Sequence, residues 1–385
     1  MNIPTGRRPG DVLFISKPLS PPFDDGGKRF VSALVRHLQL PGDRRLHLMT
    51  LRDAPTGVLP RHAVAEPLYR SSRKGYTLTP GDRLRLIRRL IKRDDEIGYH
   101  HYFFAPNPIT SLAARAVRLA ARRRQIKTLQ TILSQPRARG AALKRLLFAD
   151  VNIALSRFTA DLLTAAGAKN TIIIPPGIDL DATAAAAAGS ADGLKATYGL
   201  ADRIAVLHAG DWEFSRASGT LLRTIASVSK SAPEVKFVIA SRRKTRRSRY
   251  YELRFKSELA IRRLGNNVVF TGRVPDLPPL LAACDIVILP AGSLFAKLDL
   301  PLTLLEAMAL GKPVIISDLP PLNELFAGVE GLLHPPGDHK MLSALIVDLA
   351  HHEQWRRRLG AINRKLAAER YDIRVVAESY RRLYT

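Results

Sequence analysis

The chain has 385 residues, 46% of them hydrophobic and 24% charged, which predicts two or three folded domains and excludes a disordered chain or a collagen-like fibre. Its single cysteine, Cys284, has no second thiol in the chain to pair with, so a disulfide scaffold is excluded and a reducing compartment is expected. The chain has 60 lysines and arginines against 34 aspartates and glutamates, a formal net charge of +26. A positive charge of this size attracts phosphosugars, nucleic acids or anionic membranes.

The first half of the sequence alternates short apolar strands with amphipathic helices. Residues 11–16 predict a buried strand, a turn with Gly26 and Gly27 follows, and apolar residues then recur every three to four positions over residues 30–38. The same patterns predict strands at 46–50, 128–133, 150–155 and 171–174, and a helix at 158–166. Such alternation is typical of a parallel sheet with helices on both faces.

The second half repeats this alternation. Strands are predicted at 204–209, 235–240, 268–270, 286–289 and 313–316, and helices at 218–229, 277–283 and 302–310. The sequence therefore predicts an α/β protein with two Rossmann-like domains. We expect domains at residues 1–182 and 201–365, an alanine-rich connection or short helix at 183–200, and a last helix at 366–385 that packs back on the N-terminal domain.

The most specific segment runs from Pro301 to Asp318. Pro301 suits the first turn of a helix, Gly311 its C-terminal cap and Pro313 the start of a buried strand. Glu306 therefore lies mid-helix among apolar residues, where a carboxylate is costly to bury unless it accepts hydrogen bonds, for instance from the hydroxyls of a ribose. A lone glutamate on a solvated helix face is the commoner arrangement and the alternative.

Six segments in the right order resemble the retaining GT-B glycosyltransferases of glycosyltransferase family 4, the glycosyl transferases group 1. They are residues 24–27, 150–159, 174–179, 270–274, 283–290 and 301–318. The resemblance implies a GT-B architecture, two Rossmann-like domains with parallel sheets that face an interdomain cleft. It also implies transfer of a sugar, with retention of anomeric configuration, from a nucleotide-diphosphate donor to a glycan, lipid-linked or small-molecule acceptor, as in hexosyltransferases.

The resemblance assigns roles to residues in the donor site. Glu306 matches the glutamate that grips the ribose, Arg216 matches a cation that neutralises the diphosphate, and Arg273 and Val274 belong to the segment that holds the base. The predicted donor-binding residues are Gly26, Gly27, Gly210, Arg216, Arg273, Val274, Lys297, Leu302, Thr303 and Glu306. No cofactor or metal is expected, because no cluster of His, Cys or Asp has metal-ligand spacing.

The sequence departs from the family pattern at three positions. Leu298 stands where a first glutamate contacts the donor sugar, Asp211 where an arginine follows the glycine, and Leu133 where a histidine lies at the cleft. These departures keep open a second hypothesis, a catalytically impaired GT-B-like protein that binds a nucleotide, a glycan or a protein partner without turnover.

Three residues remain as candidates for catalysis. Asp299 would take over the sugar contact through a shifted loop, Arg216 would stabilise the departing diphosphate, and His101 of the pair His100 and His101 would reach the acceptor. A histidine satisfied within a core is the alternative for His101.

Basic segments point to further partners. Residues 83–93 place Leu84, Ile87, Leu90 and Ile91 on one side of a predicted helix and six cations around the rest, as in a helix that lies on an anionic membrane. A core-packed helix with a solvated basic face is the equal alternative.

Basic runs also occur at residues 122–124 and 242–249. Nucleic acid binding driven by charge is a third hypothesis, but no standard nucleic-acid signature is present and nucleic acid is not an expected partner. The sequence has no apolar run of about 18 residues and no predicted signal peptide. We therefore expect a cytoplasmic protein, with peripheral attachment to the inner face of the cell membrane as a weaker inference from the basic helix.

Overall fold

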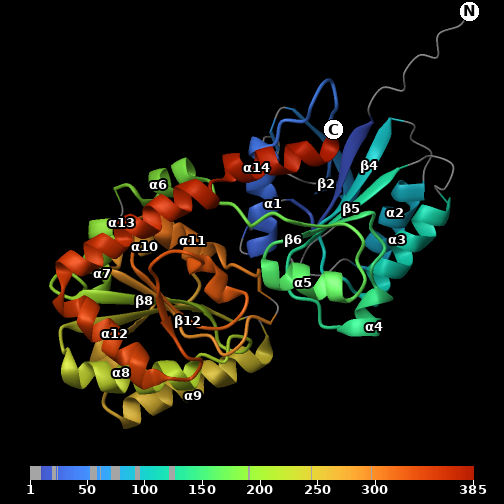
Figure 1. Ribbon diagram of the computed structural model, residues 1–385. Coiled ribbons are helices and arrows are strands. Elements are labelled where there is room, and N and C mark those ends of the chain that lie inside the picture. The colour runs from blue at the N-terminus through green and yellow to red at the C-terminus, as the bar shows by residue number, and fades with distance from the viewer. Residues whose placement is uncertain are drawn as a thin grey trace, which may run out of the picture. The chain divides into compact units, whose positions relative to one another are not determined.

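The computed structural model consists of two compact units. Unit 1 comprises Met1–Pro176 with Ile373–Thr385, and unit 2 comprises Gly177–Asp372 (Figure 1). The structure describes residues 10–385 except 20–22, 24, 53–58, 61, 71–78, 92–95, 121–125, 190, 244 and 296.

Unit 1 is built on a seven-stranded parallel sheet of order β3-β2-β1-β4-β5-β6-β7. Its strands are β1 (Asp11–Ile15), β2 (Leu46–Leu51), β3 (Ala63–Tyr69), β4 (Ile97–Tyr102), β5 (Lys127–Ile132), β6 (Val151–Ala154) and β7 (Thr171–Ile173). Its helices are α1 (Gly26–His37), α2 (Pro80–Ile91), α3 (Pro108–Ala120), α4 (Gly140–Lys144), α5 (Arg157–Ala165) and α14 (Ile373–Arg381). The strand order reverses between β1 and β4, the topological switch point of a doubly wound sheet.

Helices α2 and α3 cover one face of this sheet. Leu13 and Ile15 of β1, two residues apart and so on the same face, pack there with Leu90 of α2 and Val117 of α3. On the opposite face α14 packs beside α1, where the rings of Phe30 and Tyr380 lie 6.2 Å apart. The final helix of the chain thus completes the core of the first unit.

Unit 2 is built on a six-stranded parallel sheet of order β10-β9-β8-β11-β12-β13. Its strands are β8 (Ile204–Asp211), β9 (Val235–Arg242), β10 (Val268–Phe270), β11 (Ile286–Leu289), β12 (Val314–Ser317) and β13 (Leu332–His334). Its helices are α6 (Leu180–Ala187), α7 (Ala191–Tyr198), α8 (Ser218–Ser231), α9 (Arg246–Ile261), α10 (Pro278–Ala283), α11 (Leu302–Ala309), α12 (His339–His351) and α13 (Glu353–Arg370), with short 3-10 turns at Gly265–Asn267, Leu322–Phe326 and, in unit 1, Arg382–Tyr384. The two parallel α/β sheets confirm the predicted pair of Rossmann-like domains.

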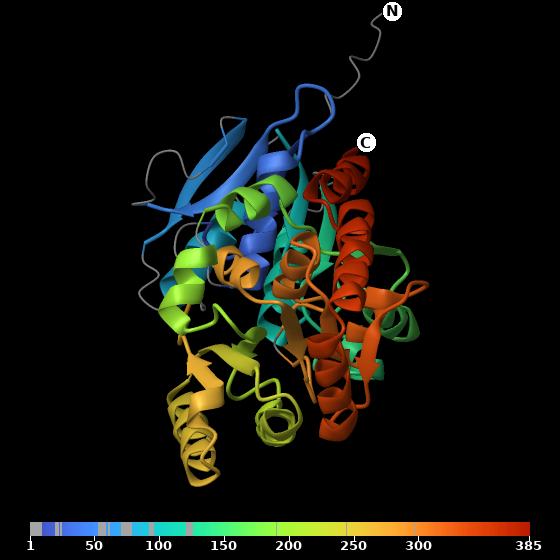
Figure 2. The same cartoon turned by 90° about the vertical axis from the view of Figure 1, so that its left-hand side faces the viewer.

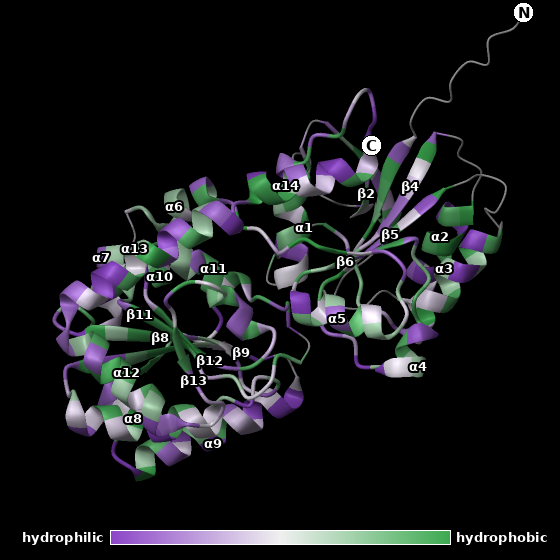
Figure 3. Ribbon diagram, in the orientation of Figure 1, coloured by the Kyte–Doolittle hydropathy of each residue, from purple (hydrophilic) through white to green (hydrophobic). Residues whose placement is uncertain are grey.

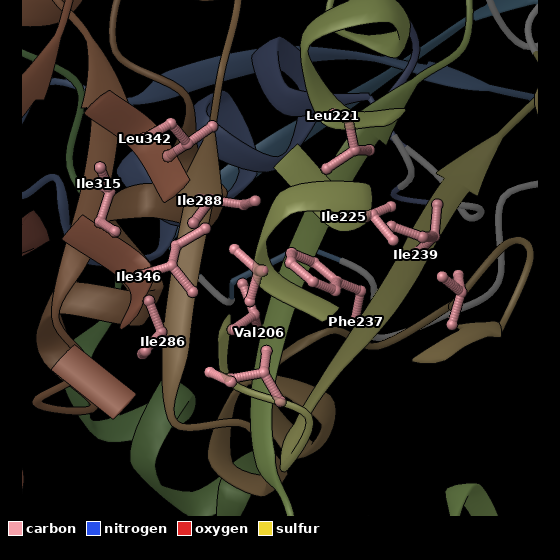
Figure 4. Packing of buried hydrophobic residues seen from close by; sticks show 14 of the residues in the cluster. Val206, Leu221, Ile225, Phe237, Ile239, Ile286, Ile288, Ile315, Leu342 and Ile346 are labelled. Atoms are coloured by element: carbon pink, nitrogen blue, oxygen red, sulfur yellow. The ribbon is translucent and has the colours of Figure 1, made fainter. Parts of the chain in front are cut away.

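The core of unit 2 is aliphatic and continuous. Ile225 of α8 and Ile346 of α12 pack with Val206, Phe237 and Ile288 of the three central strands (Figure 4). Helix α9 lies beside α8 at the edge of this unit (Figures 1 and 2). The strands of a parallel sheet are nearly continuous apolar runs because helices cover both faces of the sheet and exclude water from it.

The alanine-rich segment at 183–200 is mostly helical, the second of the two alternatives that its sequence left open, and it is not the connection between the units. It forms most of α6 and α7, which pack on α10 within unit 2. Alanine has the highest helix propensity of any residue, and these helices need little side-chain packing to form. The chain passes between the units at 176–177 and at 372–373 instead.

Candidate functional site

The loops that follow β8 and β11 meet at the switch point of unit 2. The backbone N–H of Gly292, after β11, donates a hydrogen bond of 2.8 Å to the carbonyl of Ser215, after β8. The rings of Phe214 and Phe295 from the same two loops lie 5.9 Å apart. Ligands of open α/β sheets bind outside the carboxyl ends of the strands at such a point, so this is the candidate site.

The carboxylate of Asp211 organises these loops. Its Oδ1 accepts hydrogen bonds from the backbone N–H groups of Phe214 at 2.6 Å and Glu213 at 3.1 Å. Its Oδ2 lies 2.5 Å from Nζ of Lys297, whose side chain is only 13% exposed. Asp211, at the position where the resemblance implies an arginine, is therefore paired with a lysine from the loop after β11, an arrangement that sequence patterns did not predict.

Arg216 adjoins this pair in an unusual conformation. Its φ is 53°, in the left-handed region, which costs an ordinary residue about 1–2 kcal/mol. A Cβ on Gly292 would lie 3.4 Å from Cβ of Arg216, so the two loops approach closely here. Within the described part of the chain no carboxylate forms an ion pair with Arg216, which is exposed, and its guanidinium remains open to an external anion.

Gly210 is a predicted contact of the donor substrate, but packing against His208 by itself explains why this position is a glycine. A Cβ at Gly210 would lie 3.0 Å from Nε2 of His208, two residues earlier on β8. His208 is buried, and burial lowers its pKa to about 4, so the ring is neutral at neutral pH. Sequence reasoning missed His208, since nothing in the local pattern marks it.

Helix α11 brings Leu302, Thr303 and Glu306 to the site. Its N-cap residue, Pro301, makes no side-chain hydrogen bond, and its first turn has no acidic residue. The first backbone N–H groups of a helix have no partner within the helix and carry its positive end, which favours anions. Glu306 is 2% exposed, which excludes the solvated helix face considered as its alternative.

Asp299 is fully buried. Its predicted catalytic role requires the carboxylate to contact a sugar, and this contact, like that of the buried Glu306 with a ribose, needs the covering residues to move. The role of Asp299 stays a prediction.

The segment predicted to hold the base follows β10. Gly272 there has a φ of 69°, the left-handed region that glycine adopts readily, and the side chain of Arg273 is exposed while Val274 is half-buried. The hydroxyls of Ser241, at the end of β9, and Thr271, just after β10, are buried and have no hydrogen-bond partner among the described residues. Buried polar groups are normally satisfied, and these two hydroxyls lie at the ends of neighbouring strands without a protein partner in the described part of the chain.

Gly26 and Gly27 lie in unit 1, at the start of α1. Asp25 caps this helix by accepting a hydrogen bond of 3.1 Å from the N–H of Lys28, and it pairs with Lys17 at 3.1 Å. A Cβ at Gly27 would lie 2.9 Å from Cδ1 of Leu133. The glycine thus lets α1 approach the position where the family has a histidine.

His101 does not reach the surface. It lies on β4, fully buried, with Nδ1 2.5 Å from the hydroxyl of Tyr384 and Nε2 2.8 Å from Oγ1 of Thr131. Burial lowers its pKa to about 3. The predicted catalytic role of His101 does not fit, because its neighbours enclose it and occupy both ring nitrogens; the packing alternative describes it. His100 is also buried on β4.

The described residues include neither a cluster of metal ligands nor a membrane-spanning helix. No group of three or more His, Cys, Asp or Glu side chains among them could hold a metal ion. None of the helices in that part of the chain is long and apolar enough to cross a membrane.

Comparison with known sequences finds a family match in unit 2. Residues 203–352 match the family described as glycosyl transferases group 1. A segment of 118 residues is 34% identical to the N,N'-diacetylbacillosaminyl-diphospho-undecaprenol alpha-1,3-N-acetylgalactosaminyltransferase of Campylobacter jejuni. That segment spans 30% of this chain and 30% of the relative.

Solved structures resemble almost the whole chain. Anabaena HepE in complex with UDP and glucose aligns with a TM-score of 0.73 at 19% identity, covering 97% of this chain and 99% of its own. Sucrose-phosphate synthase of Thermosynechococcus elongatus aligns with a TM-score of 0.74 at 20% identity, covering 97% and 98%. At these identities the likeness shows the fold. The chain thus carries a glycosyl transferases group 1 domain at residues 203–352 within a GT-B fold.

Proposed function

We propose that the protein is a glycosyltransferase that uses a nucleotide-diphosphate sugar as donor. The observation that carries the proposal is the junction of the loops after β8 and β11. Arg216 lies on the first loop and Lys297 on the second, which leads into α11. Two cations and a helix N-terminus together suit a diphosphate. The group 1 match covers this junction, and the similar proteins include an N-acetylgalactosaminyltransferase and HepE in complex with UDP and glucose.

Each residue then has a role in the transfer. Lys297, Arg216 and the first amides of α11 at Leu302 and Thr303 would stabilise the diphosphate as the bond to the sugar breaks. Glu306 would accept hydrogen bonds from the ribose. The charge of the leaving group is met by protein cations, so we propose no metal ion.

The base would lie along the ends of β9 and β10. Ser241 and Thr271 offer hydroxyls there, and Gly272, Arg273 and Val274 offer backbone groups. By the resemblance, the transferred group would be a hexosyl unit and its anomeric configuration would be retained.

We propose a glycan or lipid-linked acceptor. The Campylobacter jejuni relative is named for an undecaprenol-linked substrate. A lipid-linked acceptor would place the enzyme at the inner face of the cell membrane, where a basic protein is attracted by anionic lipids.

The hypothesis of an impaired relative loses one of its three supports. The reversed charge at Asp211 is matched by Lys297, 2.5 Å away. A cation therefore remains at the site although arginine is missing.

Calorimetry with UDP tests the proposal. Glu306→Gln should weaken UDP binding about tenfold to a hundredfold, because a hydrogen bond to a charged group contributes about 1.5–3 kcal/mol. The control is Glu353→Gln, at an exposed acid on α13, which should bind UDP like the wild type. Equal affinities in both variants would remove the ribose role of Glu306, and NMR of the anomeric proton in the first product would test retention.

A further inference from the structure

Helix α3 turns a row of large apolar side chains away from its own unit. Ile109, Leu112 and Leu119 are 59%, 72% and 69% exposed, and their spacing places them on one side of the helix. Ala114 and Val117 on the opposite side are buried against the sheet. A single exposed leucine is common in soluble proteins, but an apolar row along one helix marks a binding surface.

The neighbouring helix α2 extends this row. Leu84, Arg88 and Ile91 are exposed at positions i, i+4 and i+7, one face of the helix. Helices α2 and α3 pack side by side on the same face of the sheet (Figure 1). Apolar segments alternate with polar ones along both helices in Figure 3. We name the surface formed by Leu84, Arg88, Ile91, Ile109, Leu112, Arg115 and Leu119 the α2–α3 face.

The described side chains give the α2–α3 face a positive charge. Of the arginines on α2, Arg85 and Arg89 pair with acids inside the unit. Arg88 of α2 and Arg115 of α3 have no ion-pair partner among the described residues. Arg115 instead donates hydrogen bonds to the carbonyls of Arg145, at 2.7 Å, and Leu147, at 3.1 Å.

Exposed cations continue onto α4, where Lys144 and Arg145 lie next in space to α3 through the hydrogen bonds of Arg115. Aliphatic side chains interleaved with arginines are the composition that binds at the boundary between lipid headgroups and acyl chains. A second copy of this chain would bring arginine against arginine, and a nucleic acid would leave the aliphatic row in water.

We propose that the α2–α3 face docks on an anionic lipid bilayer, with Ile109, Leu112 and Leu119 entering the headgroup region and Arg88 and Arg115 contacting lipid phosphates. This deepens the membrane location given under the proposed function and adds α3, which the sequence patterns did not single out. It does not depend on the donor site.

Vesicle sedimentation of the full chain tests the proposal. Wild-type protein should sediment with vesicles of phosphatidylcholine and phosphatidylglycerol in equal parts and not with phosphatidylcholine alone. The double variant Leu112→Ser with Leu119→Ser should lower the partition coefficient about tenfold or more, because burial of a leucine contributes about 1.5–3 kcal/mol. Arg88→Gln with Arg115→Gln should lower it about tenfold or more, at about 1 kcal/mol for each cation.

The matched control is Ile261→Ser, at an equally exposed apolar residue on α9 in unit 2, and it should sediment like the wild type. None of the substituted side chains belongs to the proposed donor site, so UDP binding should be unchanged in every variant. Circular dichroism checks that the variant with Arg115→Gln, which loses two hydrogen bonds to the backbone, keeps its fold. The proposal is overturned if Leu112→Ser with Leu119→Ser has the same partition coefficient on vesicles as the wild type. The proposal is also overturned if Leu112→Ser with Leu119→Ser keeps vesicle binding but abolishes self-association of the chain. The same holds if that variant keeps vesicle binding but loses binding to a single-stranded oligonucleotide. A chain that binds vesicles but not UDP would contradict only the donor proposal.

Discussion

Nζ of Lys297 lies 2.5 Å from Oδ2 of Asp211, across 86 positions of sequence, and joins the loops after β8 and β11. The pair is largely shielded from water, and in such an environment the attraction between opposite charges is only weakly screened. Asp211 thus holds an ammonium group at the place where a diphosphate is expected, and this relationship yields the first prediction.

Lys297→Met should weaken UDP binding about tenfold to a hundredfold and leave uridine binding unchanged, because only the diphosphate needs the cation. Calorimetry with both ligands measures the difference. Lys230→Met, at an exposed lysine of α8, is the control and should bind both as the wild type does. An equal loss for UDP and uridine would mean that the substitution disturbs the loop instead of removing a phosphate contact.

Two substitutions of Arg216 should differ in their effect on the free energy of unfolding but not in their effect on UDP binding. Arg216→Gly should be about 1 kcal/mol more stable than Arg216→Ala in urea unfolding, because glycine adopts the φ of 53° without the steric cost that alanine shares with arginine. Both variants should bind UDP more weakly than the wild type, since both lack the guanidinium. If the two variants were equally stable, the left-handed backbone would not be strained.

Tyr384 should stabilise unit 1 through His101. Tyr384→Phe removes the hydroxyl that lies 2.5 Å from Nδ1 of the buried imidazole, and an unsatisfied buried polar group costs about 1–3 kcal/mol. Chemical unfolding followed by circular dichroism measures the loss. Tyr250→Phe, at an exposed tyrosine of α9, should leave the free energy of unfolding unchanged.

A buried histidine between two acids predicts a pH dependence. Nδ1 of His47 lies 3.0 Å from Glu66 and Nε2 lies 3.0 Å from Asp11. Burial acts to lower the pKa of His47, but hydrogen bonds to Glu66 and Asp11 outweigh it and the net pKa is raised. The pKa of Glu66 is lowered to about 2, burial being outweighed by Arg89 and His47, so Glu66 stays charged near neutral pH.

The stability that His47 contributes is therefore complete below its unfolded pKa of about 6.5 and is lost as the pH rises through the raised folded pKa. The free energy of unfolding of the wild type should fall over that range, whereas that of His47→Gln should stay flat. Urea unfolding at successive pH values measures both. A parallel decline in the two proteins would assign the titration to another group.

The fold was largely predictable because its strands are short apolar runs separated by glycine and proline. Three strands were not predicted, for different reasons. β4 carries His100 and His101 in place of aliphatic residues, the edge strand β3 contains Pro67, and β13 has only three residues. No strand was predicted around the histidines of β4, since a polar pair does not by itself indicate a buried strand.

The site could be predicted only where a pattern within one short segment indicates the environment of a residue. The place of Glu306 on an apolar helix left both a buried and a solvated side chain open, and the family resemblance favoured the buried one that the structure shows. The pairing of Asp211 with Lys297 and the enclosure of His101 by Tyr384 join residues far apart in the chain, and no pattern within one segment encodes such contacts.

The return of α14 to unit 1 has a consequence for how the chain is made. Translation delivers β1 first, yet the helix that covers the rings around it is synthesised only after all the residues of unit 2. Unit 1 therefore cannot complete its core until the whole of unit 2 has been synthesised. The nascent first unit thus presents an uncovered apolar surface for most of its synthesis, a natural substrate for chaperones.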